Sequence, residues 1–173
     1  MNKVIVVAAL VGVFSAGIAN AQESRPLGLT LRAGIFFPNS DAAKKNGGKQ
    51  WIGGGAEYKL GDLQFANEGN SYGASYSISV DLYQKKDFRH VPVLLNYVGR
   101  SNQGIFYTAG VGVGFARELN SLNQKKNHTT FSYQVGVGYE FTKSQVPVFI
   151  EAKYVGSSRN RLNGYGIFAG IRF

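Results

Sequence analysis

The last ten residues of the chain, Gly164-Tyr-Gly-Ile-Phe-Ala-Gly-Ile-Arg-Phe173, alternate strictly between two kinds of side chain. One parity is apolar and comprises Tyr165, Ile167, Ala169, Ile171 and Phe173. The other parity holds glycines, one phenylalanine and one arginine. A period of two predicts a β-strand, and one apolar face opposite a small or charged face suits a wall between lipid and a polar lumen. An open sheet edge cannot exist in hydrocarbon, so every other strand of such a wall must carry the same pattern.

Seven earlier segments do carry this pattern, at residues 27–37, 51–60, 72–82, 90–97, 105–116, 131–141 and 146–154. A length of about ten residues is what a strand tilted by about 45° needs to cross a bilayer. On residues 131–141 the apolar face has Phe131 and Tyr133 at one end and Tyr139 and Phe141 at the other, as interfacial aromatic girdles require. The sequence therefore predicts an all-β fold, an eight-stranded antiparallel up-and-down transmembrane β-barrel. A soluble sheet with one solvated face would leave the sorted aromatic residues unexplained.

The first 21 residues have the features of a secretory signal peptide. A basic start at Lys3 precedes an apolar run over residues 4–18, and Ala19-Asn-Ala21 supplies a small-x-small cleavage site before Gln22. An uncleaved anchor is the alternative, but the apolar run is shorter than the roughly 20 residues of a membrane helix. We therefore expect a signal peptide at 1–21 and one barrel domain at 22–173. The chain has no cysteine, which excludes disulfides, thiolate metal sites and a lipoprotein anchor.

The parity opposite the apolar one carries the charged residues of the predicted strands. Four bases and four acids share it, which predicts ion pairs inside a narrow lumen: Arg32, Glu57, Lys59, Asp81, Glu140, Glu151, Lys153 and Arg172. Which base meets which acid depends on barrel shear and is not readable from sequence. Large residues share the same parity, and the interior of an eight-stranded barrel is just wide enough for side chains to fill. We expect Trp51, Phe106, Phe149 and Phe168 to occlude the lumen.

The connections between the predicted strands differ in charge. An exported N-terminus and an even number of strands put both termini in the periplasm, so residues 61–71, 99–104 and 142–145 form the periplasmic turns. The outer loops then span residues 38–50, 84–89, 117–128 and 156–163. They contain eleven bases against only three acids, Asp41, Asp87 and Glu118. The bases are Lys44, Lys45, Lys49, Lys85, Lys86, Arg89, Arg117, Lys125, Lys126, Arg159 and Arg161.

This excess of positive charge predicts binding to anionic groups at the cell surface. Lipopolysaccharide phosphates are the first expectation, and nucleic acid or acidic host polysaccharide are the runners-up. The alternative is a basic surface that serves only solubility. Many weak, screened contacts could still bind multivalently.

Three stretches resemble a known family: Val91-Pro-Val-Leu-Leu-Asn-Tyr97, Phe106-Tyr-Thr-Ala-Gly-Val-Gly-Val-Gly114 and Tyr133-Gln-Val-Gly-Val-Gly-Tyr-Glu-Phe141. They are similar to the outer-membrane protein β-barrel family, which includes the OmpA-like membrane domain, OmpX-like barrels and opacity-type surface antigens. The resemblance implies a Gram-negative outer membrane. It also implies that the terminal strand is an insertion signal for the barrel assembly machinery, carried by Tyr165, Ile167, Ala169, Ile171 and Phe173.

Motifs that could indicate catalysis do not fit. Lipid A 3-O-deacylases are barrels of similar size that use a His-x-Ser motif, whereas His90 is followed by Val-Pro and His128 by Thr-Thr. The glycines at 110, 112 and 114 have period two inside a strand, so they do not form a dinucleotide-binding loop. The two histidines give no metal signal. We therefore expect no enzyme activity, metal or cofactor. The predicted function is that of a monomeric structural or surface-interaction barrel, with a small-solute porin or a lipid A-modifying enzyme as alternatives.

Overall fold

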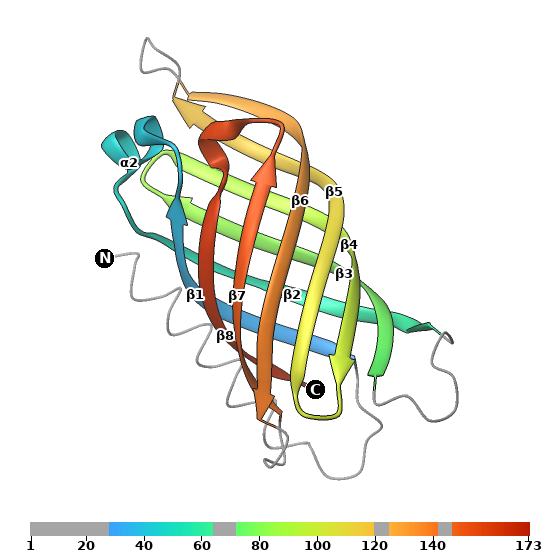
Figure 1. The fold of residues 1–173 in the computed structure, drawn as a ribbon. Coiled ribbons are helices and arrows are strands. Elements are labelled where there is room, and N and C mark those ends of the chain that lie inside the picture. Colours follow the sequence, from blue (N-terminus) through green and yellow to red (C-terminus); the bar gives the residue numbers. More distant parts are fainter. Residues whose placement is uncertain (1–27, 64–71, 120–124, 142–146) are drawn as a thin grey trace.

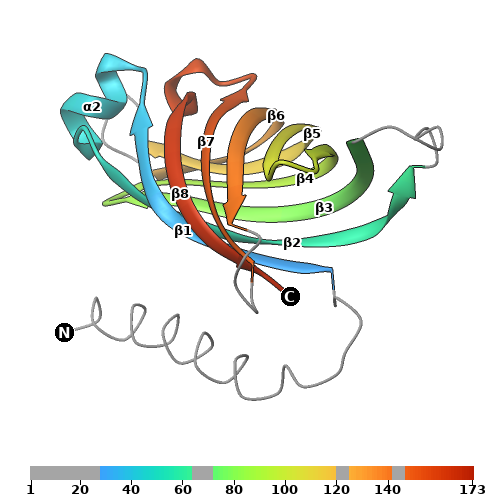
Figure 2. The same cartoon turned by 60° about the horizontal axis from the view of Figure 1, so that its bottom comes forward.

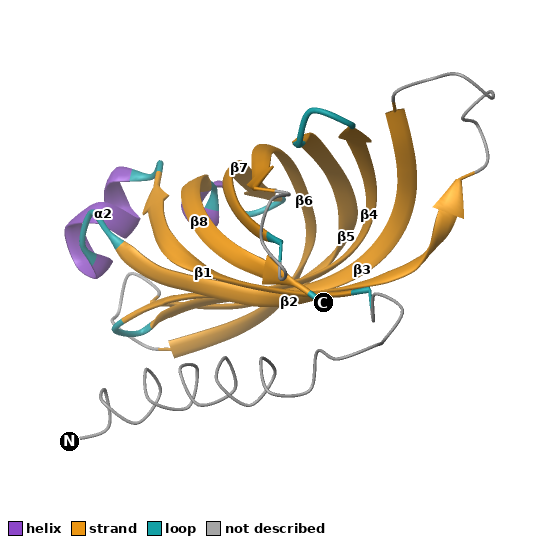
Figure 3. Ribbon diagram, turned by 90° about the horizontal axis from the view of Figure 1, so that it is seen from below, coloured by secondary structure: helices purple, strands orange, loops and turns teal. Residues whose placement is uncertain are grey.

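The computed structural model describes residues 28–63, 72–119, 125–141 and 147–173. Eight antiparallel strands follow one another in chain order and close into a barrel, which confirms the predicted fold class (Figure 1). The predicted signal peptide and residues 22–27 lie outside the described residues. So do residues 64–71 of the predicted turn 61–71, residues 120–124 of the predicted outer loop 117–128, the predicted turn 142–145 and Val146 of the predicted seventh strand. Figure 3 shows the strands curving around the lumen. The bounds are β1 Leu29–Pro38, β2 Trp51–Leu63, β3 Tyr72–Lys85, β4 Phe88–Ser101, β5 Ile105–Leu119, β6 Lys125–Phe141, β7 Val148–Ser157 and β8 Gly164–Arg172.

The first and last strands meet along the closing seam of the barrel. β1 pairs with β8 from Thr30 opposite Arg172 to Pro38 opposite Gly164. Beyond this ladder, the Gly28 amide donates to the Phe173 carbonyl at 2.8 Å, and the Phe173 amide donates to the Leu29 carbonyl at 2.8 Å. The backbone groups on this side of the predicted terminal strand therefore form hydrogen bonds with β1, as a barrel without free edges requires.

Side chains alternate between the lumen and the exterior as the sequence predicts. On β3, Ser75, Ser77, Ser79 and Asp81 are buried, while the intervening large apolar side chains are exposed. The exterior keeps aromatic residues near both ends of the strands, with Tyr97 and Tyr107 in contact on β4 and β5. Toward the other end of the barrel, neighbouring rings run from Phe131 to Tyr133, Tyr154 and Tyr165 across β6, β7 and β8. These positions match the predicted girdles.

The two ends of the barrel differ (Figures 1 and 2). The C-terminus and the β4–β5 turn lie at one end, called here the terminus end. The opposite end, called the helix end, carries α2 (Asp41–Gly47) between β1 and β2 and the 3₁₀ helix η1 (Asn160–Leu162) between β7 and β8. Among the described residues, no helix has the length and apolarity to cross a membrane.

The connections at the helix end differ from the predicted loops. The segment 38–50, expected as a loop, contains α2, which begins with Asp41 in its first turn and ends before Gly48 at φ 98°. An acid near a helix N-terminus and a glycine in the left-handed region after its end are common helix signals. Seven residues are too few for a clear hydrophobic period, so the pattern did not reveal the helix. The predicted loop 84–89 is a tight hairpin between β3 and β4, with Lys86 at φ 52°.

Several strands are longer than the ten or so residues that a bilayer crossing needs. β5 has 15 residues and β6 has 17, and both continue toward the helix end into the segment 117–128 that was expected to be a loop. The extension is ladder-paired, with Glu118 opposite Lys126. Polar residues on both faces hide it from a search for apolar alternation, and the pairing itself holds it together.

The lumen next to the helix end is filled by an aromatic plug, defined by Phe36, Trp51, Tyr83, Phe88 and Phe168. These side chains are at most 2% exposed and form one cluster with Ala43 of α2 and Leu162 of η1. Phe36 and Tyr83 have ring centroids 4.7 Å apart. The Trp51 Nε1 donates to the Gly48 carbonyl at 3.0 Å, which fastens the connection after α2 to the plug. The prediction that Trp51 and Phe168 fill the lumen is confirmed.

Candidate functional site

A central ion cluster lies in the lumen beneath the aromatic plug and consists of Arg32, Glu57, Asp81, Glu151 and Lys153. Arg32 Nε and Nη2 donate to the two Asp81 carboxylate oxygens at 2.9 and 3.0 Å. Arg32 Nη1 lies 2.8 Å from Glu57 Oε2 and 3.8 Å from Glu151 Oε2. Lys153 Nζ lies 3.0 Å from Asp81 Oδ2, so Asp81 bridges the two bases. Bidentate arginine–carboxylate contacts are strong and fix orientation, which suits a structural cluster.

Neutral polar groups extend this cluster along the lumen. Lys153 Nζ donates to Gln134 Oε1 at 3.3 Å, and Gln134 Nε2 donates to Asn96 Oδ1 at 2.7 Å. Thr108 Oγ1 donates to Glu151 Oε1 at 3.2 Å. The predicted lumen network consisted of charged residues alone and did not include these partners. Their signal was present, because they share the inward parity of their strands.

A separate pair closes the lumen near the terminus end. Arg172 pairs with Glu140, and its guanidinium carbon lies 5.5 Å from the Phe106 ring and 5.4 Å from the Phe149 ring. Phe106 and Phe149 pack edge to face with centroids 5.5 Å apart. The cation therefore rests on two of the rings that were expected to occlude the lumen.

Lys59 departs from the expected network. Instead of one of the four lumen acids, it pairs with Asp62 at 2.6 Å, and both side chains are partly exposed. A register shift between Lys59 and Gly61 marks an irregularity in β2 beside this pair. The prediction for Lys59 is wrong because the strand was expected to end at residue 60, whereas β2 continues to Leu63 and brings Asp62 within reach.

The structure also brings together a histidine and a serine that are far apart in sequence. His90 Nε2 lies 3.1 Å from Ser132 Oγ, and both side chains are fully buried in the lumen. Among the described residues, His90 Nδ1 has no hydrogen-bond partner, so no carboxylate orients the ring. A His-x-Ser search along one strand could not find this pair, because β4 supplies the histidine and β6 the serine. Both side chains lie in the packed interior of the lumen.

The eleven predicted loop bases all belong to the helix end, called here the basic end. Lys44 and Lys45 lie on α2, Lys49 precedes β2, and Lys85 and Lys86 lie at the β3–β4 hairpin. Arg89, Arg117, Lys125 and Lys126 lie on the strand extensions of β4, β5 and β6, and Arg159 and Arg161 lie at η1. Sequence reasoning placed them on loops, whereas the structure holds several on ladder-paired strands.

Three contacts show how parts of the basic end are held. Lys44 Nζ lies 3.6 Å from Asp41 within α2. Lys86 Nζ donates to the Asn46 carbonyl at 3.4 Å, which joins the hairpin to the helix. Arg159 Nη2 lies 3.2 Å from His128 Nδ1. Among the described residues, no group of three or more His, Cys, Asp or Glu side chains is placed to hold a metal ion.

A closed eight-stranded barrel with an apolar, aromatic-girdled exterior and a polar lumen defines an integral membrane β-barrel protein. The chain belongs to the outer membrane protein beta-barrel domain family, which matches residues 6–173. It is therefore an integral protein of the bacterial outer membrane. No curated protein matches the chain.

Three solved structures are similar to the chain. The Yersinia pestis outer membrane protein Ail, in a phospholipid bilayer nanodisc, is 18% identical over 84% of this chain and 98% of its own, with a TM-score of 0.47. The outer membrane enzyme PagL is 13% identical over 83% of this chain and 99% of its own, with a TM-score of 0.47. The N-terminal beta-barrel domain of Pseudomonas aeruginosa OprF is 13% identical over 86% and 100%, with a TM-score of 0.48.

Proposed function

We propose that this protein is a non-enzymatic outer-membrane barrel, structural or surface-interacting, whose basic end binds anionic groups of lipopolysaccharide. The observation that carries the proposal is the gathering of all eleven predicted loop bases at one end of the barrel. The side chains of Lys45, Lys49, Lys85 and Lys126 are exposed there. Each exposed contact would be weak and screened beyond about 8 Å at physiological salt, but many contacts on one rigid scaffold can act together.

Binding of lipopolysaccharide to the detergent-solubilised barrel across a salt series tests this proposal. A variant with Lys44, Lys45, Lys125 and Lys126 changed to Gln should bind more weakly than the native chain, and both affinities should fall as salt rises. Lys59→Gln is a single-charge control, because it removes one base at the terminus end and should leave the affinity nearly unchanged. Equal affinity of the four-lysine variant and the native chain, or no weakening with salt, would contradict the proposal.

A small-solute pore is an alternative function, and the filled lumen argues against it. The aromatic plug, the central ion cluster and the Phe106–Phe149 contact fill successive levels of the lumen with buried side chains. We expect single-channel recordings in planar bilayers to show no large, steady conductance. Such a conductance from the native chain would replace the closed-barrel proposal with a porin function.

Catalysis is the other alternative, and the His90–Ser132 contact is the one observation that favours it. A serine beside a histidine can act as a nucleophile when substrate reaches it and a third group orients the base. Both side chains here are buried in the lumen. We expect no acyl chain to be released when the purified barrel is incubated with lipid A. Release that Ser132→Ala abolishes would establish an enzyme instead.

The proposal includes insertion by the barrel assembly machinery through the terminal strand. Phe173 directly follows β8, and its amide donates to the Leu29 carbonyl at the closing seam. Phe173→Ala keeps those backbone hydrogen bonds and removes only the ring. We expect it to lower the amount of folded, heat-modifiable protein in the outer membrane while leaving the unfolding of the purified barrel nearly unchanged. Native levels of folded protein would argue against an assembly role for the ring.

A further inference from the structure

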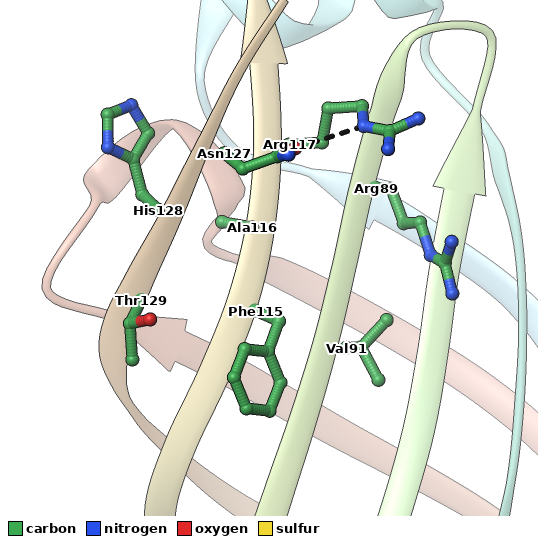
Figure 4. Close-up of a pocket in the computed structure, with 8 residues that line it drawn as sticks. All are labelled: Arg89, Val91, Phe115, Ala116, Arg117, Asn127, His128 and Thr129. Carbon is green, nitrogen blue, oxygen red and sulfur yellow. Dashed lines mark hydrogen bonds between the residues drawn. The ribbon is translucent and has the colours of Figure 1, made fainter.

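An open groove of about 470 Å³ lies at the basic end across β4, β5 and β6 (Figure 4). We call it the arginine groove. Its lining residues are Arg89, Val91, Phe115, Ala116, Arg117, Asn127, His128 and Thr129. Figure 4 shows the two arginine side chains toward the β3–β4 hairpin and Phe115 and Val91 below them. The part of the groove near the basic end is therefore polar and positively charged, and the part nearer the middle of the barrel is apolar.

The position of the groove along the membrane normal follows from the outward face of β5. This face runs from Ile105 through alternating apolar residues to Phe115, which is 54% exposed. Ten residues at about 3.4 Å each, tilted by about 45°, rise about 24 Å, close to the apolar band of about 25 Å on such barrels. Arg117 is the next outward residue after Phe115 on β5. On β4, which runs in the opposite direction, Arg89 is the outward residue just before Val91, so it also lies nearer the helix end. Both arginines therefore stand at the boundary where lipid headgroups begin.

The ladder register places the two arginines directly opposite each other. Arg89 and Arg117 are Cα partners between β4 and β5, and Val91 and Phe115 are the next outward pair. Like charges opposite each other on neighbouring strands are destabilising unless something compensates for them. The residues that line the groove include no acid. An anion between the two guanidinium groups would remove the repulsion.

The orientation of Arg117 is held from the other side of the groove. Its Nε donates to Asn127 Oδ1 at 3.1 Å, and Asn127 is its Cα partner on β6. A guanidinium is planar and carries further N–H groups in a fork that matches phosphate oxygens. The neighbouring Thr129 adds an exposed hydroxyl to the lining. These features favour a phosphate rather than a diffuse counterion.

We infer that the arginine groove binds one phosphorylated glycolipid of lipid A type, with a phosphate between Arg89 and Arg117 and an acyl chain along Val91 and Phe115. This inference rests on the proposed binding of lipopolysaccharide and assigns a defined site to one part of it. Charge complementarity decides the phosphate, and the position at the edge of the apolar band decides the acyl chain. The apolar half of the groove lies within the apolar band of the barrel, where an acyl chain of a lipid is present and a soluble peptide is not.

Binding of bisphosphorylated lipid A in mixed micelles, measured by native mass spectrometry and by titration, tests this inference. The double variant Arg89→Gln/Arg117→Gln should bind about tenfold more weakly or worse, because it loses charge-assisted hydrogen bonds. The control is Lys49→Gln/Arg161→Gln, which removes two bases of the basic end that are not among the residues lining the groove. We expect less than a threefold loss from the control. Dephosphorylated lipid A should bind the native chain and the groove variant equally.

The outcomes separate the groove from the wider proposal. Equal losses from the groove variant and the control overturn the groove and leave general binding by the basic end intact. A loss from neither variant, together with a loss from the four-lysine variant, also overturns the groove alone. Equal binding of phosphorylated and dephosphorylated lipid A by the native chain overturns both. Urea unfolding of each variant verifies that folded protein is compared.

Discussion

Arg32 in the lumen and Arg117 on the exterior show two uses of arginine in one barrel. Arg32 has a side chain only 2% exposed and lies within 4 Å of three carboxylates. Arg117 is exposed, faces a second arginine across the ladder and lies in a groove whose lining includes no acid. The interior charge is neutralised within the fold, so its removal would leave buried carboxylates without their partner. The exterior charge is left for a ligand and contributes little to the fold.

The largest effect should come from removing the interior arginine. Arg32→Gln leaves Asp81 and its neighbouring acids in a buried site without their main cation. Breaking a buried ion pair from one side costs about 3–5 kcal/mol. Equilibrium unfolding in urea, followed by the heat-modifiable gel shift, measures this loss. Arg89→Gln makes the same chemical change outside, and equal losses from the two variants would contradict the comparison.

A smaller effect is expected at the Arg172–Glu140 pair, which is about 85% buried rather than fully enclosed. Glu140→Gln or Arg172→Gln should each lower the free energy of unfolding by about 1.5–3 kcal/mol, the range of hydrogen bonds to charged groups. The double variant should lose less than the sum of the single losses, because the two residues interact directly. Additive losses in thermal unfolding would show that the pair is not coupled.

Filling the space beside the central ion cluster should cost a similar or lower amount. A Cβ on Gly136 would lie 2.8 Å from Thr108 Oγ1 and 3.0 Å from Glu151 Oε1, both fixed by their mutual hydrogen bond. Gly136→Ala should therefore lose about 1–3 kcal/mol of unfolding free energy through overpacking. Gly73→Ala is the control, since a Cβ there meets nothing within 4 Å. Equal unfolding curves for the two variants would show that the lumen has room for an added methyl group at residue 136.

The smallest effect should have the opposite sign. Arg117→Gln removes one of two like charges that lie opposite each other, so the unfolding free energy in detergent without lipid A should rise by about 0.2–1 kcal/mol or stay level. High salt should erase any gain, because exposed charges are screened. Measurement at two salt concentrations checks both points. A loss comparable to that of Arg32→Gln would mean that the exterior arginine supports the fold.

Much of the fold could be predicted from local sequence, because alternate residues of a strand face opposite sides of the sheet. The terminal run that ends at Phe173 and the aromatic pattern over 131–141 predicted a barrel wall, and the structure confirms the wall. The inward parity of Arg32 and Asp81 was also predictable. Which acid each base meets was not, since 49 residues separate these two and their contact depends on the closure of the barrel.

Alternation and composition were enough to predict an eight-stranded barrel, the side chains that face its lumen, and a surplus of bases on one set of connections. The sequence alone could not determine that Arg89 and Arg117 lie opposite each other, because register between strands depends on the whole ladder. Nor could it show the pairing of Lys59 with Asp62, which follows from the length of β2. Alternation is a property of each strand alone. Ion pairs, the aromatic plug and the arginine groove exist only once the sheet has closed and brought distant strands into one lumen and one surface.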